Sequence, residues 1–281
     1  MKKIRYIFEA IIVRLLIGIF RFLPVDMASN LGGFLGQNVA KFFVNSKKSI
    51  NNISLCLGNN RNDAVRIYNL MWENLGRNFA EYSHLQEIYT TRCDLINSPN
   101  LASVLSNPDQ PAIFFSGHIA NWEVAAPSLR QQNIDVDLIY RAPNNPYVKD
   151  ILDKCRSIDG TLKTYPKSAA GMRQVITALK QGRKIGILID QKYNQGVEVP
   201  FFGRPAMTSL AFIQLAKKFN CPLIPVQVER QNGANFKVTI HPPMDLSKDD
   251  NTLILEAHNL LENWILNKPE HWLWLHKRWK A

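Results

Sequence analysis

The sequence predicts an α/β protein: a mostly parallel β-sheet flanked by helices, with an N-terminal membrane-associated helix and a helical layer ahead of the sheet. Three observations predict this fold. Residues 1–25 are apolar but interrupted by charges, residues 26–100 are mostly helical in pattern, and later residues alternate between strand-like and helix-like segments. We therefore divide the chain into a membrane anchor helix, 1–25, and an α/β domain, 26–281. That domain consists of a helical layer, 26–100, and a sheet-containing core, 101–281.

The first segment, residues 1–25, is expected to lie at a membrane surface rather than to cross the bilayer. Arg5, Glu9, Arg14 and Arg21 interrupt its apolar residues. A spanning helix needs about 20 mostly apolar residues, and central charges are costly there. A helix in the interface, with its arginines reaching the headgroups, fits better. No small-x-small cleavage site of a signal peptide follows. A helix that simply covers the protein core is the alternative.

The helical layer is predicted from apolar residues that recur at intervals of three and four, as at Leu31, Phe34 and Leu35. Asn59, Asn60 and the pair at 62–63 mark a turn and a helix start within it.

The sheet is predicted from short, largely apolar runs of strand length at 112–115, 136–140, 185–189 and 223–228. Helical periodicity occurs at 123–130, 170–180, 209–219 and 252–266. Apolar strands separated by helices indicate a parallel sheet covered on both faces. Residues 235–240 alternate in polarity, which predicts an edge strand.

The charge balance favours anionic partners. Lys and Arg total 34 against 23 Asp and Glu, a formal net charge of +11, and such a field attracts nucleic acid, acidic proteins or membrane headgroups. The sequence has no zinc-finger spacing, no RNP-like motif and no long basic run, so nucleic acid is not an expected partner. The four cysteines are far apart and form no C-x-x-C, which gives little support to a metal site or a disulfide framework.

Ligands of open α/β sheets bind beyond the carboxyl ends of the strands. Three predicted strands end in polar residues, namely Gly117-His118, Tyr140-Arg141 and Asp190-Gln191. His118 lies at the turn after its strand, and Glu123 lies in the first turn of the next helix. The turn can return the Glu123 carboxylate to one imidazole nitrogen, which would fix the tautomer and leave the other nitrogen as a general base for an alcohol.

Other interpretations of these residues are also open. His118 and Glu123 fit a histidine that ends a strand and a glutamate that favours a helix N-terminus. Ser116 lacks the G-x-S-x-G elbow, because Phe114 stands two residues before it, and H-E-x-x-H does not occur. Neither G-x-x-x-x-G-K-[ST] nor G-x-G-x-x-G occurs, so nucleotide chemistry is not expected.

The chain resembles the late acyltransferases of lipid A biosynthesis, the lauroyl and myristoyl transferases of the lysophospholipid acyltransferase superfamily. The resemblance covers nearly the whole chain. It is carried by GHIANWE at 117–123, YRAPNN at 140–145, DQKYNQGVEVPFFG at 190–203, CPLIPV at 221–226 and PEHWLWLHKRWK at 269–280. Glu123 stands where the wider superfamily often has Asp, and His271 and Lys277 stand where relatives often have Gln and Arg.

The resemblance implies an enzyme at the cytoplasmic face of the inner membrane. It would move a fatty acyl group from an acyl-carrier-protein thioester to a hydroxyl of a lipid A precursor, a glycolipid, without a metal or a separate cofactor. His118 is the implied general base and Glu123 its assistant. The implied substrate-binding residues are Arg141, Asp190, Asn121 and Gln191.

Some of these residues have a more specific expected role. Arg141 would bind a phosphate of the acceptor, because its fork matches phosphate geometry. Asp190 would orient Arg141 or a loop, or cap a helix. Phe201 and Phe202 would line an acyl tunnel or belong to the core. Gly196, Pro200 and Gly203 would shape a loop over the acyl site. The tail would form an interfacial patch through its tryptophans and basic residues, or else pack as a strand with a solvated basic end.

Two alternatives remain open on the sequence. The acceptor can be another glycolipid or a lysophospholipid. A non-enzymatic, membrane-peripheral lipid-binding protein would explain the charge and the first helix, but it leaves His118 and Glu123 without a role.

Overall fold

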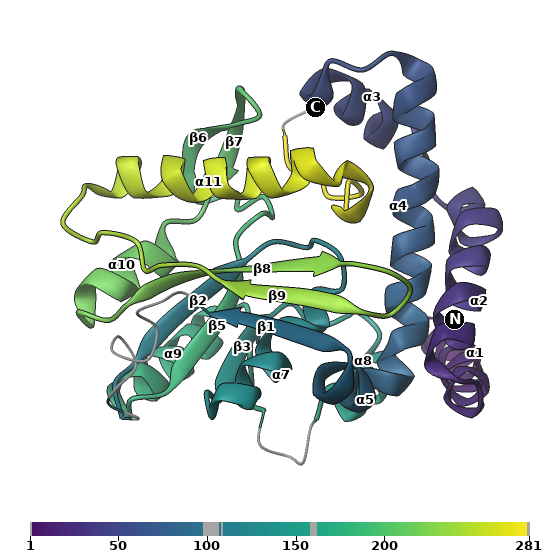
Figure 1. Ribbon diagram of the computed structural model, residues 1–281, viewed down its shortest axis with the longest axis horizontal. Helices are drawn as coiled ribbons and strands as arrows, with labels where there is room; N and C mark the ends of the chain where they lie inside the picture. The colour runs from purple at the N-terminus through teal and green to yellow at the C-terminus, as the bar shows by residue number, and fades with distance from the viewer. Residues whose placement is uncertain (1, 98–106, 108, 158–161, 280–281) are drawn as a thin grey trace.

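The computed structural model describes residues 2–97, 107, 109–157 and 162–279. It confirms the α/β fold: a seven-stranded sheet of order β1-β9-β8-β2-β5-β3-β4, with helices around it and a helical N-terminal region (Figure 1). The expected boundary at residues 100–101 lies outside the described residues.

The N-terminal region contains five α-helices among the described residues: α1 (Lys2–Phe22), α2 (Val25–Asn38), α3 (Lys47–Leu57), α4 (Arg61–Glu81) and α5 (Leu85–Thr91). A short 3-10 helix, η1 (Ala40–Phe43), follows α2, and another, η2 (Tyr82–His84), follows α4. Asn60 caps α4 by accepting a hydrogen bond from the backbone of Asp63, as the asparagine-rich turn predicts.

Glycines bring α2 and α4 close together. A methyl group on Gly36 would lie 2.1 Å from the carbonyl oxygen of Trp72, and one on Gly76 would lie 2.1 Å from that of Gly32. The two backbones therefore touch where a side chain would separate them. In Figure 1, α1, α2 and α4 stand together at one end of the sheet.

The first helix, α1, packs against α8 (Pro146–Arg156) and against the end of α4 with the adjoining η2. Phe20 is buried, and Asn145 donates hydrogen bonds to the carbonyl oxygen of Tyr6 and to Glu9. Searched over the part of the chain that the structure describes, no helix has both the length and the apolarity that a bilayer crossing requires.

The four expected apolar runs form β2 (Ala112–Ser116), β3 (Val136–Tyr140), β5 (Lys184–Leu188) and β8 (Leu223–Arg230), and these strands pair in parallel. A further strand that was not expected, β4 (Thr164–Pro166), pairs in parallel with β3. Every residue of β2 is buried, which explains its unbroken apolar run. The antiparallel pair is formed by β8 and β9 (Phe236–Ile240).

Two expectations about strands are wrong. β9 is not an edge strand, because β1 (Cys93–Asn97) pairs with its outer side. The loop expected around Gly196, Pro200 and Gly203 contains part of a two-stranded hairpin, β6 (Val197–Phe201) and β7 (Arg204–Thr208). Its turn residues Phe202 and Gly203 both have positive φ, 51° and 64°, as a tight two-residue hairpin turn requires.

The remaining helices are close to the expected ones: α7 (Ala125–Leu129), α9 (Ala169–Lys180), α10 (Ala211–Lys218) and α11 (Asp250–Asn267). The segment expected as one helix at 123–130 is divided into η3 (Trp122–Val124), α7 and η4 (Arg130–Gln132). Figure 1 shows α7 and α11 on opposite sides of the sheet.

The C-terminal tail is not an interfacial patch. Trp272, Trp274, Trp279 and Arg278 are all buried, and Trp272 forms an isolated antiparallel bridge with Ile119. The indoles pack on one another and on Phe201, which belongs to the core. Burying this much aromatic surface outweighs its amphipathic character. Lys280 lies outside the described residues, and Lys277 is exposed.

Candidate active site

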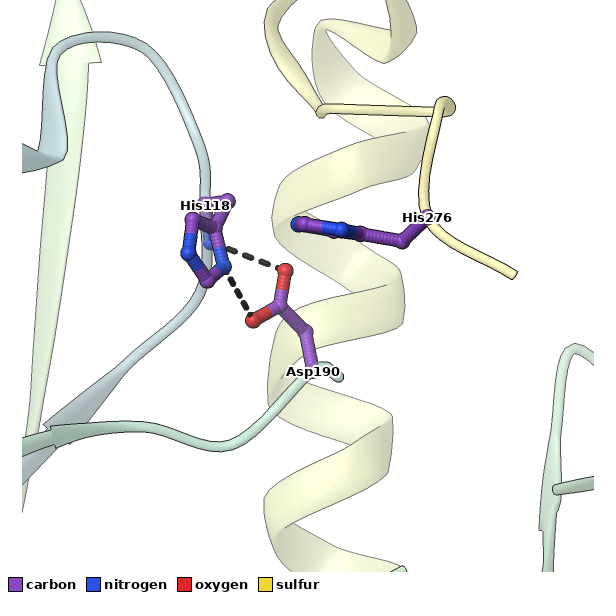
Figure 2. A group of neighbouring side chains, drawn as sticks. All are labelled: His118, Asp190 and His276. Carbon is purple, nitrogen blue, oxygen red and sulfur yellow. Dashed lines mark hydrogen bonds and ion pairs between the residues drawn. The ribbon is translucent and has the colours of Figure 1, made fainter. Parts of the chain in front are cut away.

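His118 and Asp190 meet at the carboxyl ends of two neighbouring strands. β2 ends at Ser116 and β5 at Leu188, and these two residues pair in the parallel register. Each side chain follows its strand by two residues, so the sheet places them side by side. The His118 Nδ1 atom lies 2.8 Å from the Asp190 Oδ1 atom (Figure 2).

Asp190 is completely buried and its oxygens are well satisfied. They accept hydrogen bonds from the ring and the backbone N–H of His118 and from the Trp272 indole, the last two at 2.9 and 2.7 Å. Burial alone would raise the pKa of the Asp190 carboxyl, but the charge and hydrogen bonds of His118 hold it well below its usual range. The carboxylate is therefore ionised and keeps the proton of His118 on Nδ1.

The other ring nitrogen of His118, Nε2, then carries a lone pair that faces a cavity. An imidazole held in this way by a buried carboxylate can take a proton from a hydroxyl. Of the roles expected for Asp190, namely orienting Arg141 or a loop or capping a helix, this geometry fits the second, because its oxygens bind the ring and backbone of His118 and the Trp272 indole.

Glu123 does not hold the imidazole, contrary to the expectation from its spacing. Its carboxylate accepts hydrogen bonds from Arg156 Nε and Nη2, both at 2.7 Å, from the Tyr82 hydroxyl at 2.6 Å and from the Trp122 indole at 3.0 Å. The turn after His118 points the glutamate toward α8 and η2, where a guanidinium offers two parallel donors.

Glu123 and Arg156 favour each other's charged form. Burial would raise the pKa of Glu123, but the adjacent guanidinium lowers it, and Glu123 in turn raises the pKa of Arg156 against the effect of burial. Arg156 also stacks near the rings of Tyr82 and Tyr140, with its central carbon 5.4 and 5.2 Å from their centroids.

A cavity of about 300 Å³ connects these two charged pairs. It lies between α7 and the strands β2, β3 and β5 and runs from their carboxyl ends toward the middle of the sheet. Apolar side chains form most of its wall, among them Phe114, Ala126, Leu129, Val136, Leu138 and Ile187. Gly186, in the middle of β5, lines the inner part of the cavity. Such a space suits an apolar chain whose polar end lies at His118.

The other predicted site residues divide into two groups. Arg141 is exposed at the rim of the cavity, and Gln191 lines it. Asn121 is completely buried outside the cavity lining, where it donates to Glu81 at 2.8 Å and caps η3. Asn121, which was expected to bind substrate, is thus placed where it fixes the turn that carries His118. The neighbouring Ala120 has a positive φ of 52°, and Asn74 and Asn78 on α4 bind its carbonyl oxygen.

Four residues of the site were missed in the sequence: Tyr82, Arg156, Lys167 and His276 all line the cavity. Arg156 and Lys167 lie in segments with no motif, so the sequence carries no signal for them. His276 belongs to the aromatic tail, where packing was the simpler interpretation. Its place inside the most distinctive motif of the chain could have marked it.

His118, Asp190 and His276 have metal-ligating atoms that all lie within 4.8 Å of one another. The Asp190 oxygens already accept hydrogen bonds from His118 and Trp272, and the His118 Nδ1 atom is bound to that carboxylate. A cation would have to displace these bonds, so we assign no metal to the group.

A model of the bacterial lipid A biosynthesis acyltransferase family matches residues 1–281. The chain is 26% identical over 152 residues to a lipid A biosynthesis acyltransferase of Haemophilus influenzae, covering 51% of this chain and 47% of that protein. A lipid A biosynthesis lauroyltransferase of Escherichia coli is 26% identical over 173 residues, with 58% and 54% covered. A palmitoleoyltransferase from the same organism is 25% identical over 115 residues, with 39% and 38% covered. The chain thus spans about half the length of these relatives or less.

Proposed function

The chain belongs to the bacterial lipid A biosynthesis acyltransferase family, and we propose that it moves a fatty acyl group from an acyl-carrier-protein thioester to a hydroxyl of a lipid A precursor. The observation that carries the proposal is the hydrogen bond between His118 and Asp190 at the polar end of an apolar cavity. It combines a general base with a place for an acyl chain.

In the proposed reaction, the Nε2 atom of His118 takes the proton of the acceptor hydroxyl. The hydroxyl oxygen forms a bond to the thioester carbonyl carbon, and the electrons of the C=O bond move to its oxygen. When the C=O bond re-forms, the C–S bond breaks, and the thiolate takes the proton from the imidazolium. Asp190 stabilises the imidazolium between the two proton transfers.

Glu123 contributes through Arg156 rather than through His118. The Arg156 side chain lines the cavity, and its buried Nη1 atom makes no hydrogen bond within the described residues; the Asp153 carboxylate lies 3.7 Å from it, beyond hydrogen-bond distance. Leaving such a donor unsatisfied is costly. We assign it to an oxygen of the bound substrate, with Glu123 fixing the guanidinium plane.

Two cations at the rim of the cavity, Arg141 and Lys167, suit a phosphate of the acceptor or of the pantetheine arm. Partial burial of the ammonium and the nearby charge of Arg141 lower the pKa of Lys167. An incoming phosphate would relieve this repulsion. The net charge of +11 also suits an acidic carrier protein.

The enzyme is proposed to act at the cytoplasmic face of the inner membrane, with α1 lying on the lipid surface. α1 exposes large apolar side chains, among them Ile4, Phe8, Ile11, Leu15 and Phe22, and basic residues are interspersed along it. Phe34, Phe42 and Phe43 on α2 and η1 are exposed as well. An apolar surface of this kind, accompanied by basic residues, is typical of interfacial helices.

The test is mass spectrometry of a tetra-acylated lipid A precursor, with its inner sugars attached, after incubation with the purified protein and a mixture of acyl-carrier-protein thioesters. We expect a mass gain of one acyl group and a loss of about 10³-fold or more in rate for His118→Ala. Transfer only to lysophospholipids would show that the acceptor is a lysophospholipid and not a lipid A precursor. No transfer to any lipid, or an unchanged rate for His118→Ala, would contradict the proposal.

A further inference from the structure

The side-chain amide of Gln191 lies between two histidine rings at the polar end of the cavity. Its Nε2 atom is 3.3 Å from His118 Nε2 and 3.4 Å from His276 Nε2. His276 comes from the C-terminal tail, and Figure 2 shows its ring beside that of His118 and next to Asp190. The centroids of the two rings are 4.6 Å apart. The chain thus brings an amide to the reactive nitrogen of the proposed base.

The hydrogen-bond pattern fixes which end of the amide faces the histidines. Asp190 keeps the proton of His118 on Nδ1, so His118 Nε2 is an acceptor and requires a donor. Only the NH₂ group of Gln191 can supply one, which settles the orientation of the amide. Burial, together with the adjacent imidazole of His118, lowers the pKa of His276 to about 4. At neutral pH its Nε2 atom can therefore accept the second hydrogen of the amide.

We infer that Gln191 is a catalytic residue that donates a hydrogen bond to the oxyanion of the acyl transfer, and that His276 positions it. This inference rests on the function proposed above. In the free enzyme, one amide hydrogen faces each histidine. When the acceptor hydroxyl binds to His118 Nε2, it displaces the first hydrogen, and His276 keeps the second.

The released N–H then lies beside the attacking oxygen. As that oxygen bonds to the thioester carbon, the negative charge that develops on the carbonyl oxygen accepts a hydrogen bond from the Gln191 amide. The amide gives up no proton, and its hydrogen bond to the carbonyl oxygen weakens when the C=O bond re-forms and the thiolate leaves. A donor fixed before the reaction is effective in this role because it requires no reorganisation.

The surroundings of Gln191 keep it in place. Arg278, which is fully buried, donates to the carbonyl oxygens of Gln191 and Met207 at 3.4 and 2.8 Å. Two positions before Arg278, His276 is held by the same packed tail. The buried tryptophans of the tail thus have a function in this scheme: they hold a positioning histidine against the base.

The experiment is a kinetic comparison of four variants: Gln191→Ala, Gln191→Glu, His276→Ala and the double alanine variant. The substrates are dodecanoyl- and hexadecanoyl-acyl carrier protein with the tetra-acylated lipid A precursor. For Gln191→Ala we expect kcat to fall about 10²-fold while KM for either substrate stays within about threefold, because a transition-state donor is lost. Gln191→Glu fills the same space but offers an acceptor, so it should lose as much.

His276→Ala is expected to lower kcat about 10-fold, because a misplaced donor is less effective than a fixed one. The double variant should be no slower than Gln191→Ala, since His276 acts only through the amide. Gln227 and His241 provide the control: they also form a glutamine–histidine hydrogen bond, at 3.1 Å and through the amide oxygen, outside the cavity lining. Gln227→Ala should leave kcat unchanged.

A wild-type kcat in Gln191→Ala or Gln191→Glu, or a loss confined to KM, would overturn the role of the amide. Additive losses in the double variant would overturn the positioning role of His276. These outcomes differ from a failure of the proposed function, which His118→Ala reports: if that variant keeps its rate, the general base itself is wrongly assigned.

Discussion

Two charged pairs adjoin the cavity, and each joins a buried carboxylate to a nitrogen group, but the two pairs behave differently. Asp190 binds an imidazole, a group that can gain and lose a proton. Glu123 binds a guanidinium, which cannot. The first pair can take part in proton transfer, whereas the second is a fixed dipole. The comparison teaches that the partner of a buried carboxylate, and not the carboxylate itself, decides whether the pair can act in proton transfer.

The comparison also corrects the view that a short motif contains its own catalytic pair. His118 and Glu123 are five residues apart, yet the partner of His118 is 72 residues away and the partner of Glu123 is 33 residues away. The turn that carries them sends one side chain toward β5 and the other toward α8. The motif therefore supplies one residue to each charged pair, but its two residues do not bind each other.

The largest effect is expected for Asp190→Asn. The amide keeps the shape of the side chain but no longer favours the Nδ1–H tautomer or stabilises the imidazolium, so kcat should fall about 10³-fold. Steady-state kinetics with the lipid A precursor measures this. Asp137→Asn is the matched control, because Asp137 is also buried and paired with an arginine, Arg183, but lies outside the cavity lining. A kcat loss of the same size in Asp137→Asn would show that any buried aspartate matters equally.

A smaller effect, on stability, is expected for Glu123→Gln. Removing this carboxylate takes away both short hydrogen bonds of the largely buried Arg156 cation to Glu123 and leaves only Asp153, at 3.7 Å, as a charged partner, which should lower the free energy of unfolding by about 3 kcal/mol. Urea unfolding followed by circular dichroism measures it. The pair of Lys248 and Glu256 is exposed and screened by solvent, so Glu256→Gln should change stability far less. Equal losses in both variants would contradict a special role for the buried pair.

The inner part of the cavity should respond to Gly186→Ala. A Cβ atom there would lie 2.9 Å from Leu138 Cδ2 and 3.1 Å from Val136 Cγ1, both cavity-lining side chains. The shortened cavity should lower kcat/KM for the longest accepted acyl donor about 10-fold relative to shorter ones. The chain-length distribution of the product measures this shift. Gly18→Ala, where nothing lies within 4 Å, should leave it unchanged.

The smallest expected effect is on the pH dependence of stability and concerns His258, which lies beside a cation, whereas His118 lies beside a carboxylate. Burial lowers the pKa of His258 to about 4, and Arg278 adds to the effect. The unfolded chain, with an ordinary pKa near 6.5, binds more protons over this window, so stability falls as the pH drops below 6.5 and stops falling near 4. His258 should thus contribute a loss of roughly 0.7 kcal/mol between pH 7 and 6. The pH dependence of unfolding should be weaker by this amount in His258→Gln. An unchanged slope would contradict the neutral buried state.

Much of the fold follows from local patterns in the sequence. The run at 136–140 forms β3 without a shift in its ends, and the asparagines before α4 cap it, because burial and capping act over a few residues. Strand β1 and the hairpin β6–β7 escaped prediction: three of the five residues of β1 are exposed, and the hairpin depends on positive φ at Phe202. Neither leaves an apolar run.

The site was predicted less completely than the fold. The strand ends at His118 and Asp190 were identified as the place for chemistry, but periodicity does not encode strand order, and only the pairing of β2 with β5 brings them together. Arg156 has no local signal because its role depends on how α8 packs. The composition of the tail suggested that its tryptophans lie at a membrane interface. They belong to the core instead, and the sequence does not show this because their partner Phe201 comes from a distant hairpin.

The most direct test of the account is the pH dependence of kcat/KM for Asp190→Asn and Glu123→Gln, measured side by side. Removing the negative charge of Asp190 makes protonation of the His118 ring less favourable, so the acid limb of the Asp190→Asn profile should move to lower pH, on top of its lower rate. The acid limb of Glu123→Gln should stay at its wild-type position, whatever its rate. A shifted acid limb in Glu123→Gln with an unshifted one in Asp190→Asn would show that Glu123 assists the base, and would contradict the assignment.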